Sequence, residues 1–319
     1  MYLICTKMKN YSDKYFLGYF KILHLNDKHL QNYTTFDNNI TFIKHIFFLY
    51  FNIKKFKPPS NKMNPQLNYK IMGQGYPVII LHGLFGMLDN WQFIAKKLAD
   101  TGFMAILVDQ RDHGRSPHTE DFNYHLLAQD IYRLINDLHL NRPILIGHSM
   151  GGKTCLQFVS DYESIISKLV VVDIGIKRYE GDHQHVFDAL FDVNLKEVTS
   201  RSEVEKILSK HLNDTGTIQF LMKNLSRDKE GGFEWKMNLP LLFKKYQNIL
   251  SNVQFSHRVM TTTLFIKGDK SDYILHEDWP EILDVLPNSQ LKTISEAGHW
   301  VHADQPLELF DIIIDFIKE

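Results

Sequence analysis

Cysteine is scarce in this sequence, which has 319 residues and only two cysteines, Cys5 and Cys155. Two thiols are too few for a disulfide framework or a structural zinc cluster. A charge excess is also missing, since 36 Lys and Arg stand against 37 Asp and Glu. The net charge therefore gives no overall electrostatic field that would favour binding to nucleic acid or to an anionic membrane. The hydrophobic share of 44% and the charged share of 23% exclude a wholly disordered or collagen-like chain.

Long apolar runs are missing as well. The most apolar stretch of the first 62 residues is residues 40–51, which Lys44 and His45 interrupt. It spans about a dozen residues, whereas a membrane-spanning helix needs roughly 20. The N-terminus also lacks the basic start and apolar core of a secretory signal, and the arginine and serine of a transit peptide. We therefore expect no membrane span and a cytoplasmic location.

Residues 1–62 differ in composition from the rest of the chain. They contain ten Lys, three Asp and no Arg or Glu, a net charge of +7, while the remaining residues carry a net charge of −8. They also lack Ala, Val and Trp. Met63 opens a segment typical of a natural start, so residues 1–62 are either a mis-called upstream extension or a separate segment. We assign them no chemistry.

From residue 63 onward, short apolar runs alternate with amphipathic segments. The apolar run at 77–81 predicts a strand that is buried on both faces of a sheet, and the run at 104–108 predicts the next buried strand. Further strands are predicted at 143–146, 169–172 and 263–266, and the last one at 290–295. Helical spacing occurs at 89–100, after the capping residue Asn123, and in a closing segment that begins at Pro306. The alternation predicts an α/β protein with a mostly parallel sheet and helices on both faces.

The alternation breaks between residues 176 and 256. This stretch is roughly 80 residues long, which exceeds an ordinary connection between strands. Its apolar clusters predict several helices. We therefore expect an inserted helical cap at 176–256, while residues 63–175 and 257–319 form the α/β core.

One short motif carries the strongest chemical signal. Residues 147–151, Gly-His-Ser-Met-Gly, have the form G-x-S-x-G and lie between a predicted strand and an apolar helical segment. This order predicts a sharp turn that exposes Ser149 as a nucleophile, and the glycines permit a strained backbone and close packing. The N-terminus of the helix directs free N–H groups at an oxyanion beside that serine.

A serine hydroxyl needs a base that accepts its proton. In α/β-hydrolases the catalytic order is Ser, acid, His, and the histidine lies in the loop after the last strand. Residues 297–300, Ala-Gly-His-Trp, fit that loop. His299 is therefore the predicted base, and His302, closer to the last helix, is predicted to be structural.

The acid has three candidates at the carboxyl ends of predicted strands, where sites on such sheets gather. Asp173 lies 24 residues after the serine, and Asp269 and Asp272 follow the strand that ends at Gly268. Many α/β-hydrolases place their acid three residues after such a glycine, where this chain has Ser271. Residue positions alone leave the choice of acid open.

Two further segments complete the predicted site. Residues 82–86, His-Gly-Leu-Phe-Gly, follow a strand at the place where a second oxyanion donor is needed. The N–H groups of Leu84 and Met150 are the predicted donors. The charged block at 109–116 is predicted to brace the site. The candidate walls of a substrate pocket are Phe85, Trp91, His148 and Trp300.

No cofactor or metal is expected. His183 and His185 are two residues apart, which is not a helical ligand spacing, and no carboxylate cluster accompanies them. Gly73-Gln74-Gly75 lacks the remaining residues of a phosphate-binding loop.

From about residue 65 to the end, the chain resembles α/β-hydrolase esterases of the YbfF type and their mitochondrial α/β-hydrolase-domain relatives. The resemblance rests on five ordered blocks at 82–91, 109–117, 147–153, 172–174 and 297–303. It implies hydrolysis of carboxylic esters or thioesters with short to medium acyl chains, acyl-CoA included. It also implies that Asp173 is the acid, with Asp272 as the alternative. Residues 1–62 have no counterpart in that family.

The resulting prediction is a serine hydrolase in which Ser149 attacks an acyl carbonyl, His299 accepts the proton and Asp173 orients the histidine. A small-molecule ester or thioester is the expected partner, and no nucleic acid is expected. Two alternatives stay open. The same triad can serve carbon–carbon bond hydrolysis or a menaquinone-pathway elimination, or the fold can bind a small ligand without catalysis. The sequence predicts neither the acyl length nor the oligomeric state.

Overall fold

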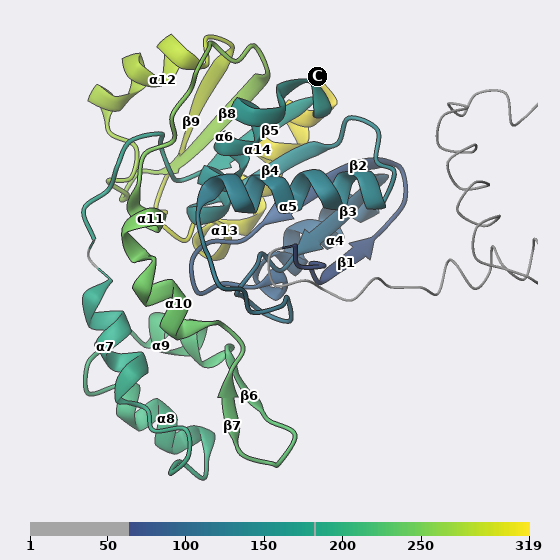
Figure 1. Ribbon diagram of the computed structural model, residues 1–319. Coiled ribbons are helices and arrows are strands. Elements are labelled where there is room, and N and C mark those ends of the chain that lie inside the picture. Colours follow the sequence, from purple (N-terminus) through teal and green to yellow (C-terminus); the bar gives the residue numbers. More distant parts are fainter. Residues whose placement is uncertain (1–63, 182) are drawn as a thin grey trace, which may run out of the picture. The chain divides into compact units, whose positions relative to one another are not determined.

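The computed structural model describes residues 64–181 and 183–319, so the predictions for residues 1–62 lie outside the described residues. The described residues form a seven-stranded sheet covered by helices, and a second group of helices with a two-stranded hairpin (Figure 1). In these two ranges, no helix combines the length and the apolar composition that a membrane crossing requires.

The large sheet is parallel except at one edge. Its strands lie in the order β1-β3-β2-β4-β5-β8-β9, and β1 alone runs antiparallel to its neighbour, β3. The chain moves from β2 to β3 on one side and then to β4 on the other. The loops after β2 and β4 therefore meet where the strand order reverses, the usual place for a site in such sheets. The strands are β1 (Tyr69–Met72), β2 (Tyr76–Leu81), β3 (Phe103–Val108), β4 (Ile144–His148), β5 (Lys168–Val172), β8 (Thr262–Gly268) and β9 (Ser289–Ile294).

Helices cover both faces of this sheet (Figure 1). One apolar core lies under α5, α6 and α12, and a second lies under α4 and α14 on the opposite face. Asn123 caps α5 as predicted, because its side chain accepts a hydrogen bond from the Leu126 amide. The predicted fold class is confirmed. The helices are α4 (Gln92–Asp100), α5 (Tyr124–Asp137), α6 (Met150–Tyr162), α12 (Trp279–Val285), α13 (Val301–Asp304) and α14 (Pro306–Lys318), with short 3-10 turns at Leu88–Trp91, Glu163–Ile165 and His276–Asp278.

Strand β1 is absent from the sequence predictions. Its sequence, Tyr-Lys-Ile-Met, is too short and too mixed to form an apolar run, and three of its four residues are exposed. Its pairing with β3 holds it in place, with Tyr69 opposite Val108 and Met72 opposite Ala105. An edge strand of this kind depends on backbone pairing, which a hydrophobic pattern does not reveal.

Between β5 and β8 lies an inserted segment whose described residues form five helices and a hairpin. The hairpin is a difference from the purely helical expectation: Phe233 and Trp235 are buried while Glu234 is exposed, an alternation too short to stand out in a sequence. In Figure 1 the elements from α7 to α10 gather to one side of the large sheet. They are α7 (Gln184–Asp192), α8 (Arg201–Leu208), α9 (Thr215–Met222), β6 (Leu225–Arg227), β7 (Phe233–Trp235), α10 (Leu239–Lys244) and α11 (Tyr246–Leu250).

The inserted segment has its own apolar core, which extends to the carboxyl edge of the large sheet. Phe187, Val204 and Leu242 are buried in it together with Phe85 and Met150, from the loops that follow β2 and β4. The inserted segment is therefore packed directly against the loops that carry the predicted site.

Lys153 on α6 connects the two ends of the inserted segment. Its ammonium group donates to the carbonyl of Lys177 at 2.8 Å and to the carbonyl of Ser251, and it lies 4.6 Å from the centre of the Tyr179 ring. Burial lowers the pKa of this amine to about 7. The hydrogen bonds fix both ends of the segment to the helix that begins beside Ser149.

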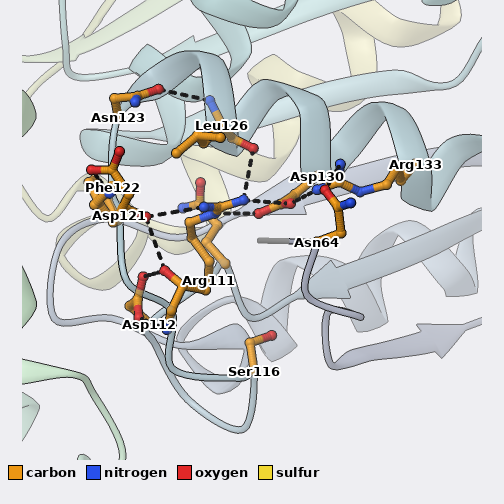
Figure 2. Close-up of polar contacts among 12 residues, drawn as sticks. Asn64, Arg111, Asp112, Ser116, Asp121, Phe122, Asn123, Leu126, Asp130 and Arg133 are labelled. Atoms are coloured by element: carbon orange, nitrogen blue, oxygen red, sulfur yellow. Dashed lines mark hydrogen bonds and ion pairs between the residues drawn. The ribbon is translucent and has the colours of Figure 1, made fainter. Parts of the chain in front are cut away.

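A buried ion pair braces the charged loop after β3 (Figure 2). Arg111 donates to Asp130 through Nε at 2.6 Å and through Nη2 at 2.9 Å, and both side chains are 1% exposed. Nη1 of the same guanidinium donates to the carbonyl of Asp121 at 3.1 Å. Arg133, which is 28% exposed, also pairs with Asp130 and donates to Asn64. These contacts hold the charged loop itself against α5.

Replacing Asp130 with alanine is expected to destabilise the fold by about 3–5 kcal/mol, because the Arg111 charge would stay buried without its partner. Arg133→Ala is the matched control: it leaves the Arg111 pair intact and should cost no more than about 1 kcal/mol. Urea unfolding followed by circular dichroism measures both. Equal effects of the two substitutions would contradict the account of this pair.

Candidate active site

Ser149 stands between β4 and α6 on a strained turn. Its backbone has φ 53° and ψ −120°, which is unusual for a residue with a side chain. The Ser149 amide donates to the carbonyl of Val172 on the neighbouring strand at 3.0 Å, and its own carbonyl accepts from Lys153 N at 3.0 Å. The side chain is half-buried, so its hydroxyl can be reached from a pocket.

The glycines of the motif permit this turn by close packing. A Cβ on Gly147 would lie 2.3 Å from the carbonyl oxygen of Gly151, and a Cβ on Gly151 would lie 2.5 Å from that of Leu81. Both distances are far below van der Waals contact. A side chain at either position would therefore keep strand β2, the turn and α6 from packing as closely as they do.

Three predicted side chains form one chain of hydrogen bonds. His299 Nδ1 lies 2.8 Å from Asp173 Oδ2, and His299 Nε2 lies 3.0 Å from Ser149 Oγ. With the ring proton on Nδ1, the histidine donates to the carboxylate and accepts from the serine hydroxyl. This is the arrangement in which an imidazole can take a proton from a serine.

Asp173 is fully buried and has further donors. The Gly268 amide donates to its Oδ1 at 3.0 Å, and the Ser271 hydroxyl donates to Oδ2. Asp272 and Asp269 are exposed, and Asp269 accepts from the Ala297 amide at 3.2 Å. Of the three candidate acids, Asp173 is the one that the structure places against His299.

In the sequence, Ser271 is distinguished only by its position, three residues after Gly268, where many α/β-hydrolases have their acid. The structure places its hydroxyl on the carboxylate of Asp173, so the residue contacts the site from the loop after β8. Tyr273 from the same loop stacks on the His299 ring, with centroids 3.9 Å apart and planes 15° apart. The sequence feature that could have indicated both residues is their position just after the carboxyl end of a predicted strand.

The two predicted oxyanion donors belong to the loop after β2 and to the first turn of α6. Leu84 is the second residue of a turn that the Gly86 amide closes by donating to the Gly83 carbonyl at 3.0 Å. Met150 is the first residue of α6, where amide groups have no partner within the helix. A Cβ on Gly83 would lie 3.2 Å from Cβ of Ser149, so the two loops are in contact.

The four predicted pocket walls border one cavity, called pocket A here. It has a volume of about 560 Å³, is open to solvent and reaches Ser149 and His299. Phe85, Trp91, His148 and Trp300 all line it, and His302 does so as well. The inserted segment contributes walls that carry no sequence motif and were therefore not predicted. They are His183, Val186, Thr217, Phe220 and Leu221.

Buried histidines surround this site. His82 Nδ1 donates to the Gly83 carbonyl at 2.8 Å, and Nε2 accepts from the Gln110 amide at 3.1 Å. His148 Nε2 donates to the carbonyl of His299 at 2.8 Å. The His302 ring stacks on Trp91 at 4.8 Å. These contacts support the loops on both sides of Ser149.

Burial lowers the pKa of His82, His113 and His302 to about 4 from 6.5, and the pKa of His148 well below 6.5. The unfolded chain binds protons below pH 6.5 that the folded chain does not bind. The contribution of these neutral histidines to the free energy of unfolding is therefore fully present above pH 6.5. It is lost as the pH falls toward 4, and each histidine accounts for a loss of about 1.4 kcal/mol per pH unit.

Urea unfolding at pH 7.5, 6 and 5 measures this loss. We expect the midpoint to fall steadily below about pH 6.5, and His302→Phe to reduce the slope because the substitution removes one of the protons. A midpoint that is constant from pH 7.5 to 5 would show that the histidines are not held neutral.

Known proteins resemble the chain over this same region. Residues 76–306 match the family described as alpha/beta hydrolase fold. The sn-1-specific diacylglycerol lipase ABHD11 of Danio rerio is 34% identical over 254 residues, 77% of this chain and 80% of that protein. Esterase YbfF of Escherichia coli is 34% identical over 234 residues, 72% of this chain and 88% of that protein.

A solved structure, a marine microorganism esterase, superimposes with a TM-score of 0.78 and 38% sequence identity, covering 79% of this chain and 100% of that one. The sequence relatives and this structure confirm the resemblance to YbfF-type esterases and their α/β-hydrolase-domain relatives. On the fold, the family match and these identities, this chain belongs to the α/β-hydrolase family.

Proposed function

We propose that this protein hydrolyses carboxylic esters through an acyl-enzyme formed on Ser149. The observation that carries the proposal is the chain of hydrogen bonds from Asp173 through His299 to Ser149 at the border of pocket A. The relatives named esterase and lipase support an ester as the substrate.

In the first half of the reaction, Ser149 Oγ attacks the ester carbonyl carbon while its proton moves to His299 Nε2. The carbonyl oxygen becomes an oxyanion, which accepts hydrogen bonds from the amides of Leu84 and Met150. The bond from carbon to the ester oxygen then breaks. His299 gives its proton to that oxygen, and the alcohol leaves.

In the second half, water takes the place of the alcohol. His299 removes a proton from the water, which attacks the acyl carbon, and the proton returns to Ser149 as the acid departs. Asp173 keeps its hydrogen bond to His299 throughout, and donors from Gly268 and Ser271 hold its side chain in place. Its carboxylate stabilises the imidazolium form of His299.

The inserted segment is proposed to act as a cap, at residues 176–256, that sets substrate preference. Phe220 and Leu221 on α9 and Val186 on α7 line pocket A, opposite the loops of the core. The Danio rerio relative is named a diacylglycerol lipase. An acylglycerol is accordingly one candidate substrate, and a thioester such as an acyl-CoA is another with the same reacting carbonyl.

Hydrolysis of p-nitrophenyl esters from acetate to dodecanoate tests the proposal, alongside an acyl-CoA and a diacylglycerol with matched acyl chains. We expect turnover of the esters, with a preference for one range of chain length. Thioester turnover at a comparable rate would extend the substrate class. A protein that is folded, and that hydrolyses none of these compounds, would contradict the proposed function.

A further inference from the structure

Asn224 of the inserted segment contacts the loop that carries a proposed oxyanion donor. It lies between α9 and β6 and is fully buried, and its Nδ2 donates to the carbonyl of Phe85 at 2.7 Å. Phe85 directly follows Leu84, whose amide is the donor in question. Building on the proposed function, we propose that Asn224 is a positioning residue for the reaction: it holds and polarises the Leu84 amide that receives the oxyanion.

Two peptide groups lie in series between the Asn224 side chain and the oxyanion. The first contains the Phe85 carbonyl, which accepts from Asn224, and the Gly86 N–H. That N–H donates to the Gly83 carbonyl at 3.0 Å, and this carbonyl shares the second peptide group with the Leu84 N–H. Hydrogen bonds in series polarise one another in a buried environment. The donor on Asn224 therefore strengthens the Leu84 N–H as a hydrogen-bond donor.

The turn at residues 83–86 needs such support because its backbone is strained. Phe85 is the third residue of the turn and has φ 57°, which is unfavourable for a bulky side chain. His82 holds the start of the turn from the core, because its Nδ1 donates to the Gly83 carbonyl at 2.8 Å. Among the described residues, Asn224 provides the one side chain that donates to the Phe85 carbonyl. The turn is therefore held at one end by the core and at the other by the inserted segment.

The backbone of Asn224 is fixed on both sides. Its amide donates to the carbonyl of Leu221 on α9 at 2.9 Å, and its carbonyl accepts from the amide of Lys236, just after β7, at 2.8 Å. The Asn224 side chain therefore projects from a well-held junction between a helix and the hairpin β6–β7, as the positioning of a catalytic group requires.

The polar atoms of the Asn224 side chain are used unequally. Nδ2 has the Phe85 carbonyl as its partner, whereas Oδ1 is buried and has no hydrogen-bond partner within the described part of the chain. A buried acceptor without a partner is unfavourable, so an apolar side chain would serve packing alone better. What asparagine adds at this position is the donor to the strained turn.

Asn224 does not reach the space in which a substrate would lie. Ser149 borders pocket A and a second cavity, which has a volume of about 420 Å³ and is lined among others by Ile249 and Tyr273. Asn224 lines neither of these two cavities. Any effect of its side chain on the reaction therefore has to pass through the turn that it holds.

Asn224→Leu tests this role, because it removes the donor and leaves a side chain of similar size. Asn248→Leu is the matched control. Asn248 also joins the inserted segment to the core by one amide hydrogen bond, from Nδ2 to the Phe122 carbonyl at 2.9 Å, but it does not contact the turn at residues 83–86. Thermal unfolding establishes that both variants are folded. Asn224→Ala serves if the leucine variant does not fold.

Two measurements are made on each variant. The first is kcat and KM with a p-nitrophenyl ester. The second is inhibition by an alkyl trifluoromethyl ketone, a mimic of the tetrahedral intermediate. Ser149 Oγ adds to the ketone carbon, its proton moves to His299, and the carbonyl electron pair moves to the oxygen, which becomes an oxyanion. The affinity for this ketone therefore depends on the oxyanion donors.

We expect Asn224→Leu to lower kcat by about 10- to 100-fold. This is less than the loss on the order of 10²–10³ that follows removal of an oxyanion donor, because the Leu84 amide is still present but less well placed. KM should stay within about threefold of the wild-type value, and the affinity for the ketone should fall by a factor similar to that of kcat/KM. Asn248→Leu should leave both measurements near the wild type.

A folded Asn224→Leu variant with wild-type kcat and ketone affinity would overturn the role of Asn224 while ester hydrolysis stands. A rise in KM alone would also overturn it, because the side chain would then act on substrate binding. An equal loss of kcat in Asn248→Leu would overturn it too, since any contact of the inserted segment with the core would then matter alike. A wild type that hydrolyses no ester would overturn the proposed function and this role with it.

Discussion

Replacing Ser149 with alanine is expected to reduce kcat for ester hydrolysis by on the order of 10⁴–10⁶. The variant loses the atom that forms the acyl-enzyme, and no neighbouring hydroxyl group stands 3.0 Å from His299 Nε2 as Ser149 Oγ does in the described chain. Initial rates with a p-nitrophenyl ester measure the loss. The remaining activity reflects binding and the oxyanion donors, which act without the nucleophile.

Ser209→Ala, an exposed serine in the inserted segment, is the control for this substitution and should keep wild-type activity. Thermal unfolding of both variants checks the fold. Positive φ at Ser149 is no harder for alanine than for serine, so the fold should be unaffected. A Ser149→Ala variant that retains more than about a hundredth of the activity would mean that another group attacks the ester.

Asp173→Asn is expected to reduce kcat by on the order of 10⁴, while Asp272→Asn leaves it almost unchanged. The amide has the shape of the carboxylate but no charge, so it neither stabilises the imidazolium nor holds the proton on Nδ1 of His299. Asp173 is buried against the ring at 2.8 Å, whereas Asp272 is exposed. The two substitutions are chemically identical, which makes the position of the carboxylate the sole difference.

Steady-state rates of the two asparagine variants, with fluorophosphonate labelling as a second readout, decide between the acids. Labelling should be slow in Asp173→Asn, because the serine is less activated, and normal in Asp272→Asn. A large loss in the Asp272 variant alone would contradict the role given to Asp173. Equal losses in both would show that neither carboxylate acts through the histidine by itself.

Most of the sheet could be predicted because its central strands are buried on both faces. The run at 77–81 has to be apolar throughout for that reason, and it corresponds to β2. Strand β1 carries no such run, since it is exposed at the edge and depends on its pairing with β3. The hairpin β6–β7 escaped prediction because three residues per strand give too short an alternation.

The residues of the candidate site also fall into a group that could be predicted from the sequence and a group that could not. Ser149 and His299 could be predicted because a turn between strand and helix and a loop after the last strand have recognisable sequences. Position alone left the acid open; the family resemblance favoured Asp173, and the hydrogen bond to His299 agrees with it. Phe220 and Ile249 could not be predicted, because an apolar residue on a helix of the inserted segment has the same pattern whether it faces a core or a pocket.

The central claim is that His299 activates Ser149 as a nucleophile. Labelling of the wild type with a fluorophosphonate, followed by mass spectrometry of the tryptic peptides, tests it most directly. We expect one adduct, on Ser149, that is absent from Ser149→Ala and forms much more slowly in His299→Gln. A folded wild type that gains no adduct, or that carries it on another residue, would contradict the claim.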